Sequence, residues 1–429
     1  MKAHKSLQGK GAMVQDAGVR DVAELDLPYL PMETAAFAAD PFAGVAEARR
    51  QHPWLSTSKF GLVIHDYQAM NDIFRMEDKL RVPYGGIVEM LGLQGTPWGR
   101  FTEEQMISLP RDQHKLLRHA FAARFTPRYA NTLRPRMVEV VNRLLDEFTT
   151  SGEMDFEDFA SHFPISVMFA LVGAPLSDVY GMRDDLEAIG LAHSYEMDRF
   201  PRIQQAMVRL DAYVQDLIAH RRAHPEEDNP DDLLHLLIET SDEGGVSHRT
   251  LVDLIMFFFI AGYDTTKNVL TYTMWTLLDY PDIYARCAED HDYCRKVVEE
   301  ALRWFNPGTL ARIVDADLVY RGVRLPADTM VFMPLSISGR DAVAFADART
   351  FDPDRPIDPE RRHIAFGLGK HMCLGQYIAR AQLQEALHQI ARRIRNPRLA
   401  GEFSWRPFFG TWGLMGLPIR FGRQAEPVT

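Results

Sequence analysis

The chain has 429 residues, 46% of them hydrophobic, which is enough to build a substantial core. A formal net charge of −11 excludes the dominant basic field that a nucleic-acid-binding protein needs, although it leaves room for local basic patches. The three cysteines make neither a disulfide framework nor a CxxC zinc pattern, which favours a reducing compartment, and we expect the cytoplasm.

The N-terminal segment is polar and mixed in charge, and it lacks the apolar core and cleavage site of a signal peptide. We therefore expect a flexible tail over residues 1–26. No internal repeat or low-complexity linker divides the rest, so a single domain is expected over residues 27–429. The most apolar run, residues 254–262, is too short to span a membrane, and we expect no membrane anchor.

Apolar residues spaced three and four apart predict five long helices. They cover residues 137–148, 203–222, 250–278, 295–305 and 376–394. Shorter strand patterns occupy residues 61–64, 317–320, 330–333 and 417–421. Arg321–Gly322 suits a hairpin turn after the second of these strands. The predicted fold class is therefore α+β, mostly α with small β-sheets.

The predicted helix 250–278 contains the sequence Ala261-Gly262-Tyr263-Asp264-Thr265-Thr266. A glycine with nearby hydroxyl side chains can loosen the helical hydrogen bonds, so we expect the helix to open locally. An acid beside an alcohol can also relay protons. In the simpler interpretation, the threonines bond to carbonyls of their own helix and Asp264 pairs with a surface cation.

Glu300 and Arg303 are three residues apart on the predicted helix 295–305, so their side chains share one face within pairing distance. Taken alone, such a pair is usually solvated and contributes little to stability. The sequence pattern by itself therefore assigns no special role to it.

Residues 366–375 read Phe-Gly-Leu-Gly-Lys-His-Met-Cys-Leu-Gly, directly before the predicted helix 376–394. The glycines let the backbone close around Cys373, whose sulfur would lie near backbone N–H groups and a helix N-terminus. Both favour a thiolate, and a bound metal such as iron would stabilise it further. Because most lone intracellular cysteines are simply buried apolar residues, that interpretation also stays open here.

The pattern Phe-x-x-Gly-x-His-x-Cys-x-Gly resembles the cysteine loop of the cytochrome P450 family, the haem-thiolate monooxygenases, in their soluble bacterial form. Ala379 fits the family's extension of this motif, and the acid–alcohol and Glu-x-x-Arg motifs occur in the family's order. The resemblance covers roughly residues 53–421. It implies the family's fold, with haem b between the long distal helix 250–278 and the proximal loop, and Cys373 as the ligand of the iron.

The resemblance also implies roles for the other motif residues. Thr265 would be the alcohol and Asp264 the acid that deliver protons during oxygen activation. Glu300, Arg303 and Arg355 would form a structural anchor behind the haem. The residues expected to hold the haem and its propionates are Cys373, His114, Arg118, Arg312, His363, Phe366, Gly367 and Ala261.

A substrate pocket is expected on the distal side of the haem. Counting back from Thr265 by three to four residues reaches Ala261 and then Phe257 or Phe258, one of which we expect to belong to the core. The residues expected to line the pocket are Phe257, Phe258, Ala261, Thr309, Leu310, Thr411 and Trp412. This lining suits a small hydrophobic substrate such as a terpenoid, an aromatic or a fatty chain.

The resemblance implies a monooxygenase that inserts one oxygen atom from O2 into a C–H bond. The sequence shows no flavin, nicotinamide or iron–sulfur fingerprint, so we expect electrons from a separate ferredoxin and ferredoxin reductase. An acidic ferredoxin could dock on a basic face around the cysteine loop, although such charges can also be a scattered solvated surface. The cations that define this face are Lys115, Arg124, Arg361 and Lys370.

Two alternatives come from other classes of haem-thiolate protein. A sensor or carrier, in which redox state or gas binding changes the iron ligands, has no need of the acid–alcohol pair. A peroxide-using enzyme bypasses the electron donor, and such members of the family usually lack that pair. Asp264 and Thr265 therefore distinguish the monooxygenase from both.

Overall fold

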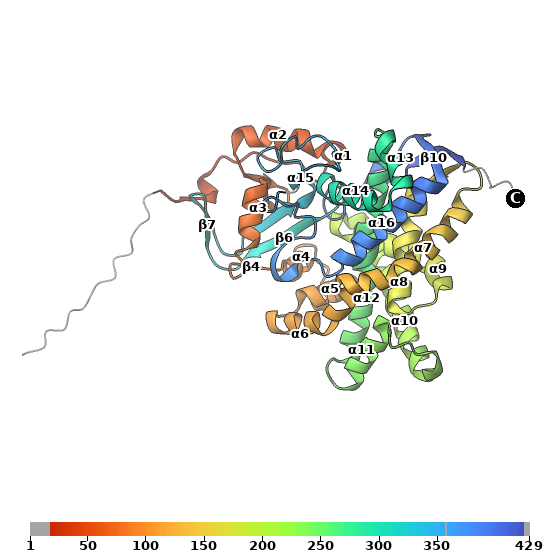
Figure 1. Ribbon diagram of the computed structural model, residues 1–429. Helices are drawn as coiled ribbons and strands as arrows, with labels where there is room; N and C mark the ends of the chain where they lie inside the picture. Colours follow the sequence, from red (N-terminus) through yellow and green to blue (C-terminus); the bar gives the residue numbers. More distant parts are fainter. Residues whose placement is uncertain (1–17, 357, 424–429) are drawn as a thin grey trace, which may run out of the picture.

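The computed structural model describes residues 18–356 and 358–423, and helices make up most of them (Figure 1). The helices are α1 (Ala35–Ala39), α2 (Pro41–Gln51), α3 (Tyr67–Phe74), α4 (Tyr84–Met90), α5 (Pro97–Glu104), α6 (Arg111–Phe121), α7 (Pro127–Phe148), α8 (Phe156–Val172), α9 (Val179–Gly190), α10 (Phe200–Ala223), α11 (Leu233–Asp242), α12 (His248–Leu277), α13 (Pro281–Glu289), α14 (His291–Trp304), α15 (Leu335–Ser338) and α16 (Gln376–Arg393). The predicted class, mostly α with small β-sheets, is confirmed.

The strands are short. They are β1 (Arg20–Asp21), β2 (Leu55–Ser58), β3 (Gly61–Ile64), β4 (Leu80–Arg81), β5 (Glu153–Asp155), β6 (Thr309–Val314), β7 (Leu318–Tyr320), β8 (Val323–Leu325), β9 (Met330–Pro334), β10 (Ile394–Leu399), β11 (Ser404–Trp405), β12 (Leu414–Met415) and β13 (Pro418–Arg423). The largest sheet has the order β2-β3-β9-β6-β4, with Leu310 of β6 opposite Met333 of β9. Smaller sheets have the orders β1-β8-β7, β10-β13-β5 and β11-β12.

All five predicted helices are present, as α7, α10, α12, α14 and α16, but four of them begin earlier than predicted. The apolar spacing located each helix, whereas polar capping residues decide where it starts. Thr126 accepts a hydrogen bond from the backbone N–H of Tyr129 at 3.2 Å and so starts α7, with Pro127 in its first turn.

The predicted strands and hairpin turn are also present, as β3, β7, β9 and β13. Arg321 and Gly322 join β7 to β8, with Tyr320 opposite Val323. Their φ angles of 46° and 76° are both left-handed, as a tight two-residue hairpin turn requires.

The folded part of the chain begins earlier than expected. Arg20–Asp21 forms β1, which pairs in parallel with β8, and the Asp21 carboxylate forms an ion pair with Arg324. The expected tail over residues 1–26 is therefore too long, because this strand pairing is a contact with a distant segment that the local sequence does not show. Residues 1–17 lie outside the described part of the chain.

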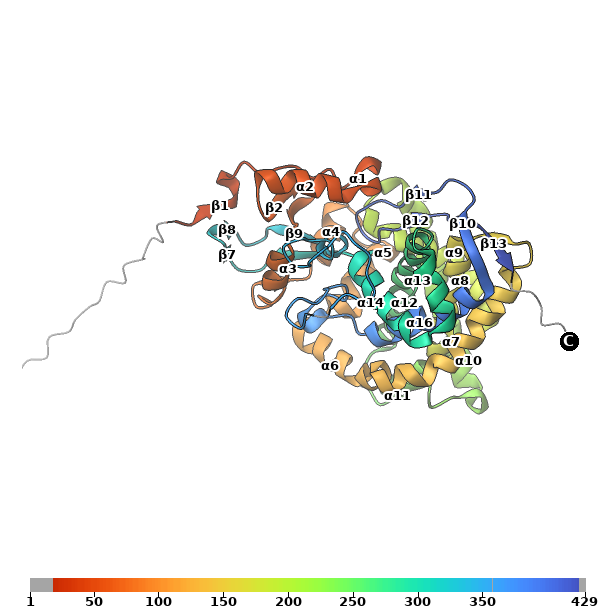
Figure 2. The ribbon, with the colours of Figure 1, turned by 45° about the horizontal axis from the view of Figure 1, so that its top comes forward.

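Helix α12 runs through the middle of the helical part of the molecule (Figure 2). It packs against α8, α9, α10 and α16. Gly262 allows the closest of these approaches, because a side chain there would collide with the Met168 side chain of α8. None of the described helices is long and apolar enough to cross a lipid bilayer.

Candidate functional site

Cys373 lies in a tight loop, residues 366–375, directly before α16. Its backbone N–H donates to the carbonyl oxygen of Phe366 at 2.8 Å, which closes the loop. Gly367 and Gly369 have φ angles of 67° and 71°, a left-handed backbone that residues with a side chain rarely adopt. The turn itself therefore requires these two glycines.

The Cys373 side chain has exposed surface and is nevertheless withdrawn from bulk water. Burial raises the pKa of its thiol, while the Gly375 N–H and the cations Arg118 and Arg380 act in the opposite direction. A side chain that is both exposed and desolvated faces an internal cavity. Donors and cations around such a sulfur fit a thiolate that binds a metal ion.

A stripe of exposed surface runs along α12. The middle of the helix is otherwise largely buried, but Phe257, Ala261 and Thr265 keep exposed surface. Residues four apart share one face of a helix, so the three side chains point the same way. We infer that this stripe and Cys373 face one internal cavity from opposite sides.

The expected opening of the helix at Ala261–Thr266 is wrong, because α12 is continuous from His248 to Leu277. Gly262 serves the close packing against α8 instead of loosening the helix. Thr265 Oγ1 donates to the Ala261 carbonyl oxygen at 3.4 Å, a long bond that leaves the helical ladder intact.

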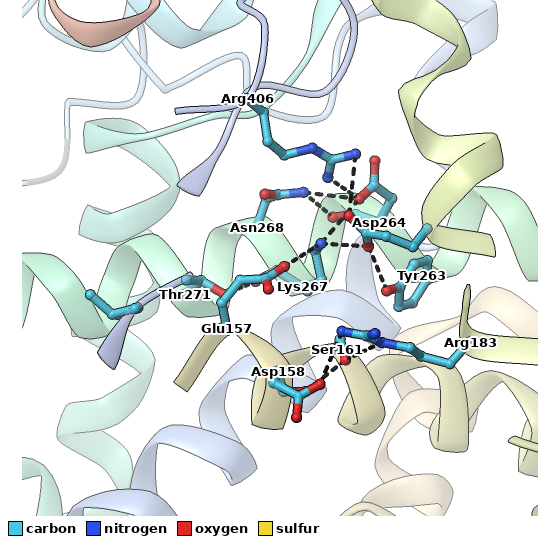
Figure 3. A network of polar contacts seen from close by, with 12 residues as sticks. Glu157, Asp158, Ser161, Arg183, Tyr263, Asp264, Lys267, Asn268, Thr271 and Arg406 are labelled. Atoms are coloured by element: carbon cyan, nitrogen blue, oxygen red, sulfur yellow. Dashed lines mark hydrogen bonds and ion pairs between the residues drawn. The ribbon is translucent and has the colours of Figure 1, made fainter. Parts of the chain in front are cut away.

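Asp264 points away from the stripe into a buried polar network (Figure 3). Its Oδ1 accepts hydrogen bonds from Arg406 Nη1 and from Asn268 Nδ2, the latter at 3.0 Å. Lys267 Nζ lies 3.9 Å from the same oxygen. The side chains of Arg406 and Lys267 are 1% and 0% exposed, so the simpler interpretation, in which Asp264 pairs with a surface cation, is wrong.

The network continues from Lys267 to two more carboxylates (Figure 3). Lys267 Nζ donates to Glu157 at 2.6 Å and to Glu187 at 2.7 Å, and Glu187 also accepts from the Tyr263 hydroxyl at 2.8 Å. Burial favours the neutral form of Glu187, but Lys267 and Arg406 outweigh it and lower the pKa of this carboxyl to about 2. The buried lysine therefore bridges two carboxylates, of which Glu187 is held in its ionised form. Sequence reasoning missed Lys267 and Arg406, because neither belongs to a motif.

Positively charged and imidazole side chains gather at a second opening, a cavity of about 330 Å³. Its lining includes His114, Arg312, Lys370 and His371. The rings of His114 and His371 lie 4.4 Å apart, centre to centre. Within the described residues, His114 Nε2 and His371 Nδ1 are buried without a hydrogen-bond partner. Unpartnered imidazoles beside a guanidinium fit the carboxylates of a bound group, as haem propionates would be.

His371, and not His363, lines this cavity. The His363 ring bonds to Glu299 at 3.0 Å, and Glu299 also pairs with Arg380, so His363 is already occupied. Burial and the neighbouring Arg312 lower the pKa of His371 to about 3. His371 is the histidine of the cysteine motif itself, so its position in the motif was the signal that could have identified it.

Arg118 approaches the cysteine loop directly, because its Nη2 donates to the carbonyl oxygen of Met372. Behind the loop, Arg303 donates to Glu300 at 2.8 Å and to the Ala348 carbonyl oxygen at 3.0 Å, and Arg355 Nε lies 3.5 Å from Glu300. The structure therefore brings Glu300, Arg303 and Arg355 together. Glu300 and Arg303 are buried, which excludes the solvated pair that the sequence pattern alone suggested.

Two of the expected pocket residues belong to the core. Phe258 packs between Phe121 and Phe125, and Trp412 is stacked on Trp405 while its Nε1 donates to the Ala38 carbonyl oxygen. Phe258 is thus the member of the Phe257–Phe258 pair that belongs to the core, as expected for one of the two. The placement of Trp412 in the pocket is wrong, because aromatic packing from distant segments covers it. Phe257, Ala261, Thr309, Leu310 and Thr411 keep exposed surface.

The expected docking cations divide into two groups. Lys115 and Arg361 are exposed, and Lys115 is followed on α6 by the exposed Leu116, which sequence reasoning missed. Arg124 donates to the Pro230 carbonyl oxygen, and Lys370 contacts Glu77 and lines the 330 Å³ cavity. The basic face is therefore smaller than expected.

Comparison with known proteins agrees with this geometry. A family model described as Cytochrome P450 matches residues 63–395. The luteothin monooxygenase of Streptomyces thioluteus is 33% identical over 402 residues, covering 92% of this chain and 97% of its own. The vitamin D(3) 25-hydroxylase of Pseudonocardia autotrophica is 32% identical over 329 residues, covering 74% and 78%. Two solved structures share the fold: P450BioI with an acyl carrier protein (TM-score 0.80, 24% identity, covering 90% and 100%) and CalO2 (0.82, 23%, covering 92% and 100%).

Proposed function

Because the chain belongs to the cytochrome P450 family, a family of haem-thiolate monooxygenases, we propose that it inserts one oxygen atom from O2 into a C–H bond of a small hydrophobic substrate. The observation that carries this proposal is that Cys373 and the α12 stripe ending at Thr265 both keep exposed surface, although Cys373 is withdrawn from bulk water. A relative named as a vitamin D(3) hydroxylase supports a hydrophobic substrate of the terpenoid, aromatic or fatty class.

The haem supplies the oxygen chemistry, because a thiolate ligand favours cleavage of the O–O bond. Cys373 provides that thiolate, and its loop holds the sulfur beside the Gly375 N–H. His114, Arg312 and His371, which line the cavity, would bind the propionates of the haem. Arg118 holds the loop through the Met372 carbonyl oxygen.

On the distal side, the Thr265 hydroxyl holds a proton at the cavity surface. Asp264 is the acid that supplies a new proton to Thr265 once the first has been given up. The apolar faces of Phe257, Ala261 and Leu310 exclude water from the substrate. A sensor or carrier has no need of such a buried acid network beside an alcohol, which favours catalysis over gas sensing.

The test of the haem assignment is the difference spectrum of the reduced protein with carbon monoxide. A thiolate-bound haem gives a strongly red-shifted Soret band, and Cys373→His should move this band to the position typical of histidine ligation. If the wild type gives a histidine-type band, or binds no haem, the proposed function is wrong.

We also propose that an acidic ferredoxin delivers the electrons at the exposed part of α6 formed by Lys115 and Leu116. A large exposed leucine, 66% accessible, beside a cation suits a transient protein contact. Lys115→Glu should slow reduction by ferredoxin and should weaken the dependence of the rate on salt. Arg50→Glu on α2, which both views place away from α6, is the matched control. Equal rates for both variants would contradict the docking face.

A further inference from the structure

The two oxygens of Asp264 have different surroundings. Oδ1 accepts from both Arg406 and Asn268, so its lone pairs are occupied. Oδ2 is buried and, among the described residues, has no hydrogen-bond partner. Arginine and carboxylate usually pair through two parallel hydrogen bonds, whereas here Arg406 Nη2, among the described residues, makes no hydrogen bond either.

The neighbouring backbone contributes to this one-sided arrangement. Gly190 ends α9 directly against the acid, and a Cβ at this residue would lie 2.6 Å from Asp264 Oδ2. Gly413 approaches Asn268 so closely that a side chain there would collide with the Asn268 amide. Gly190 has a helical backbone, with φ of −57°, which any residue could adopt. The glycine is needed instead because Asp264 Oδ2 lies too close for a side chain.

Arg406 also links the acid to a different part of the fold. It follows β11, and its backbone N–H donates to the Gly413 carbonyl oxygen at 2.9 Å across the β11–β12 hairpin. The tip of this hairpin meets β6, where the Thr309 N–H donates to the Gly410 carbonyl oxygen at 3.2 Å. Thr309 and Thr411 belong to the expected pocket lining. The hairpin that carries Arg406 therefore borders the substrate side.

We propose that Arg406 is a positioning residue for proton delivery. Together with Asn268 it occupies Oδ1 of Asp264, so that Oδ2 is the oxygen left free to accept and pass on a proton, and it fixes the orientation of that oxygen from the hairpin beside the expected substrate pocket. This inference rests on the proposed function, because it assigns a part of the oxygen-activating reaction. Arg406 acts through Asp264 and does not touch the substrate.

The two carboxylates beside Arg406 support its link to Asp264. Burial alone would lower the pKa of Arg406, but the Asp264 and Glu187 carboxylates raise it above its ordinary value. Arg406 Nη2 lies 3.8 Å from Glu187 Oε1, whose side chain is 27% exposed. Arg406 thus lies between the acid and the solvent-exposed end of the network.

The experiment compares Arg406→Gln with Arg406→Lys, and Gly190→Ala with Gly181→Ala. Gly181 is also on α9, but a Cβ there meets no atom within 4 Å, so it is a matched control. The measurements are product formed per pair of electrons consumed, hydrogen peroxide released, and the solvent isotope effect. Substrate-induced spin shift and the carbon monoxide spectrum report substrate and haem binding separately.

Arg406→Gln should lower the yield of product per electron pair about tenfold and raise peroxide release, since acid–base groups contribute roughly 10²–10⁴-fold to proton transfer. Arg406→Lys should restore part of the yield. Gly190→Ala should lower it several-fold in the wild type and cause no further loss in an Asp264→Asn background. Spin shift and carbon monoxide spectrum should be unchanged in all variants.

The inference is wrong if Arg406→Gln binds haem and substrate but forms product with the wild-type yield, or if Gly190→Ala behaves like Gly181→Ala. If Arg406→Gln fails to fold, the product yields of Gly190→Ala and Gly181→Ala decide whether the orientation of Asp264 Oδ2 controls proton delivery. A wild type without a red-shifted carbon monoxide band would contradict the proposed function instead.

Discussion

Replacing Lys267 by methionine removes a fully buried cation that bridges Glu157 and Glu187 at 2.6 and 2.7 Å. The pKa of Glu187 is lowered from 4.5 to about 2, a difference of about 2.5 units, or about 3 kcal/mol at 1.36 kcal/mol per unit. Arg406 supplies part of this effect. Loss of one partner from a buried ion pair costs roughly 3–5 kcal/mol, so we expect Lys267→Met to destabilise the protein by about 3 kcal/mol.

The pH dependence of the destabilisation caused by Lys267→Met gives a sharper test than its magnitude at a single pH. Because the folded-state pKa of Glu187 is depressed, its contribution is fully present above the unfolded value of 4.5 and is lost as the pH falls towards about 2. In Lys267→Met the pKa of Glu187 is lowered less, so ionisation of this carboxyl contributes less to the free energy of unfolding. The difference in unfolding free energy between wild type and variant should therefore shrink as the pH falls through this window.

The assay is urea unfolding of the haem-loaded protein at 25 °C, followed by circular dichroism at a series of pH values. The matched control is Lys296→Met, because Lys296 pairs with Asp354 at 2.7 Å with both side chains about half exposed. An exposed pair of this kind contributes about 0–1 kcal/mol. If Lys267→Met costs no more than the control, or if its cost does not change with pH, the reasoning about the buried network is refuted.

The remaining predictions concern the haem, the alcohol and the anchor. His371→Ala should weaken haem retention, whereas His363→Ala should not, because the His363 ring is bonded to Glu299; haem loss to apomyoglobin measures both, and the opposite order would contradict the assignment. Thr265→Ala should leave the carbon monoxide spectrum unchanged but divert electrons to peroxide, and unchanged product yield would exclude its proton role. Glu300→Gln should lower the stability by roughly 3–5 kcal/mol, measured by urea unfolding, since Arg303 then stays buried without its partner carboxylate; a cost under about 1 kcal/mol would show a solvated pair instead.

The sequence alone located those parts of the site whose geometry is local. The turn around Cys373 follows from Gly367 and Gly369, because a left-handed backbone is intrinsic to the residue that adopts it. The Arg321–Gly322 turn was also predictable from its own residues, and the spacing of apolar residues located the five long helices. Helix starts were less predictable, since capping depends on single polar side chains.

Other features were undetermined because they depend on contacts between distant segments. The partner of Asp264 is Arg406, which arrives from a hairpin near the C-terminus, and no local pattern marks it. Gly262 was read as a point of helix opening, whereas contact with Met168 of α8 shows that it serves packing. His363 and Trp412 were assigned to the site from their place in the chain. In the structure, the His363 ring is hydrogen-bonded to Glu299 and Trp412 is stacked on Trp405.

The sequence thus determined the proximal loop, the helical class and the family, because the spacing of glycines, apolar residues and motif residues is encoded within short segments. The tertiary structure alone decided which face of α12 meets the cavity, which histidine joins Arg312, and which buried cations hold the acid. Those outcomes depend on desolvation and charge pairing between segments that meet only after folding.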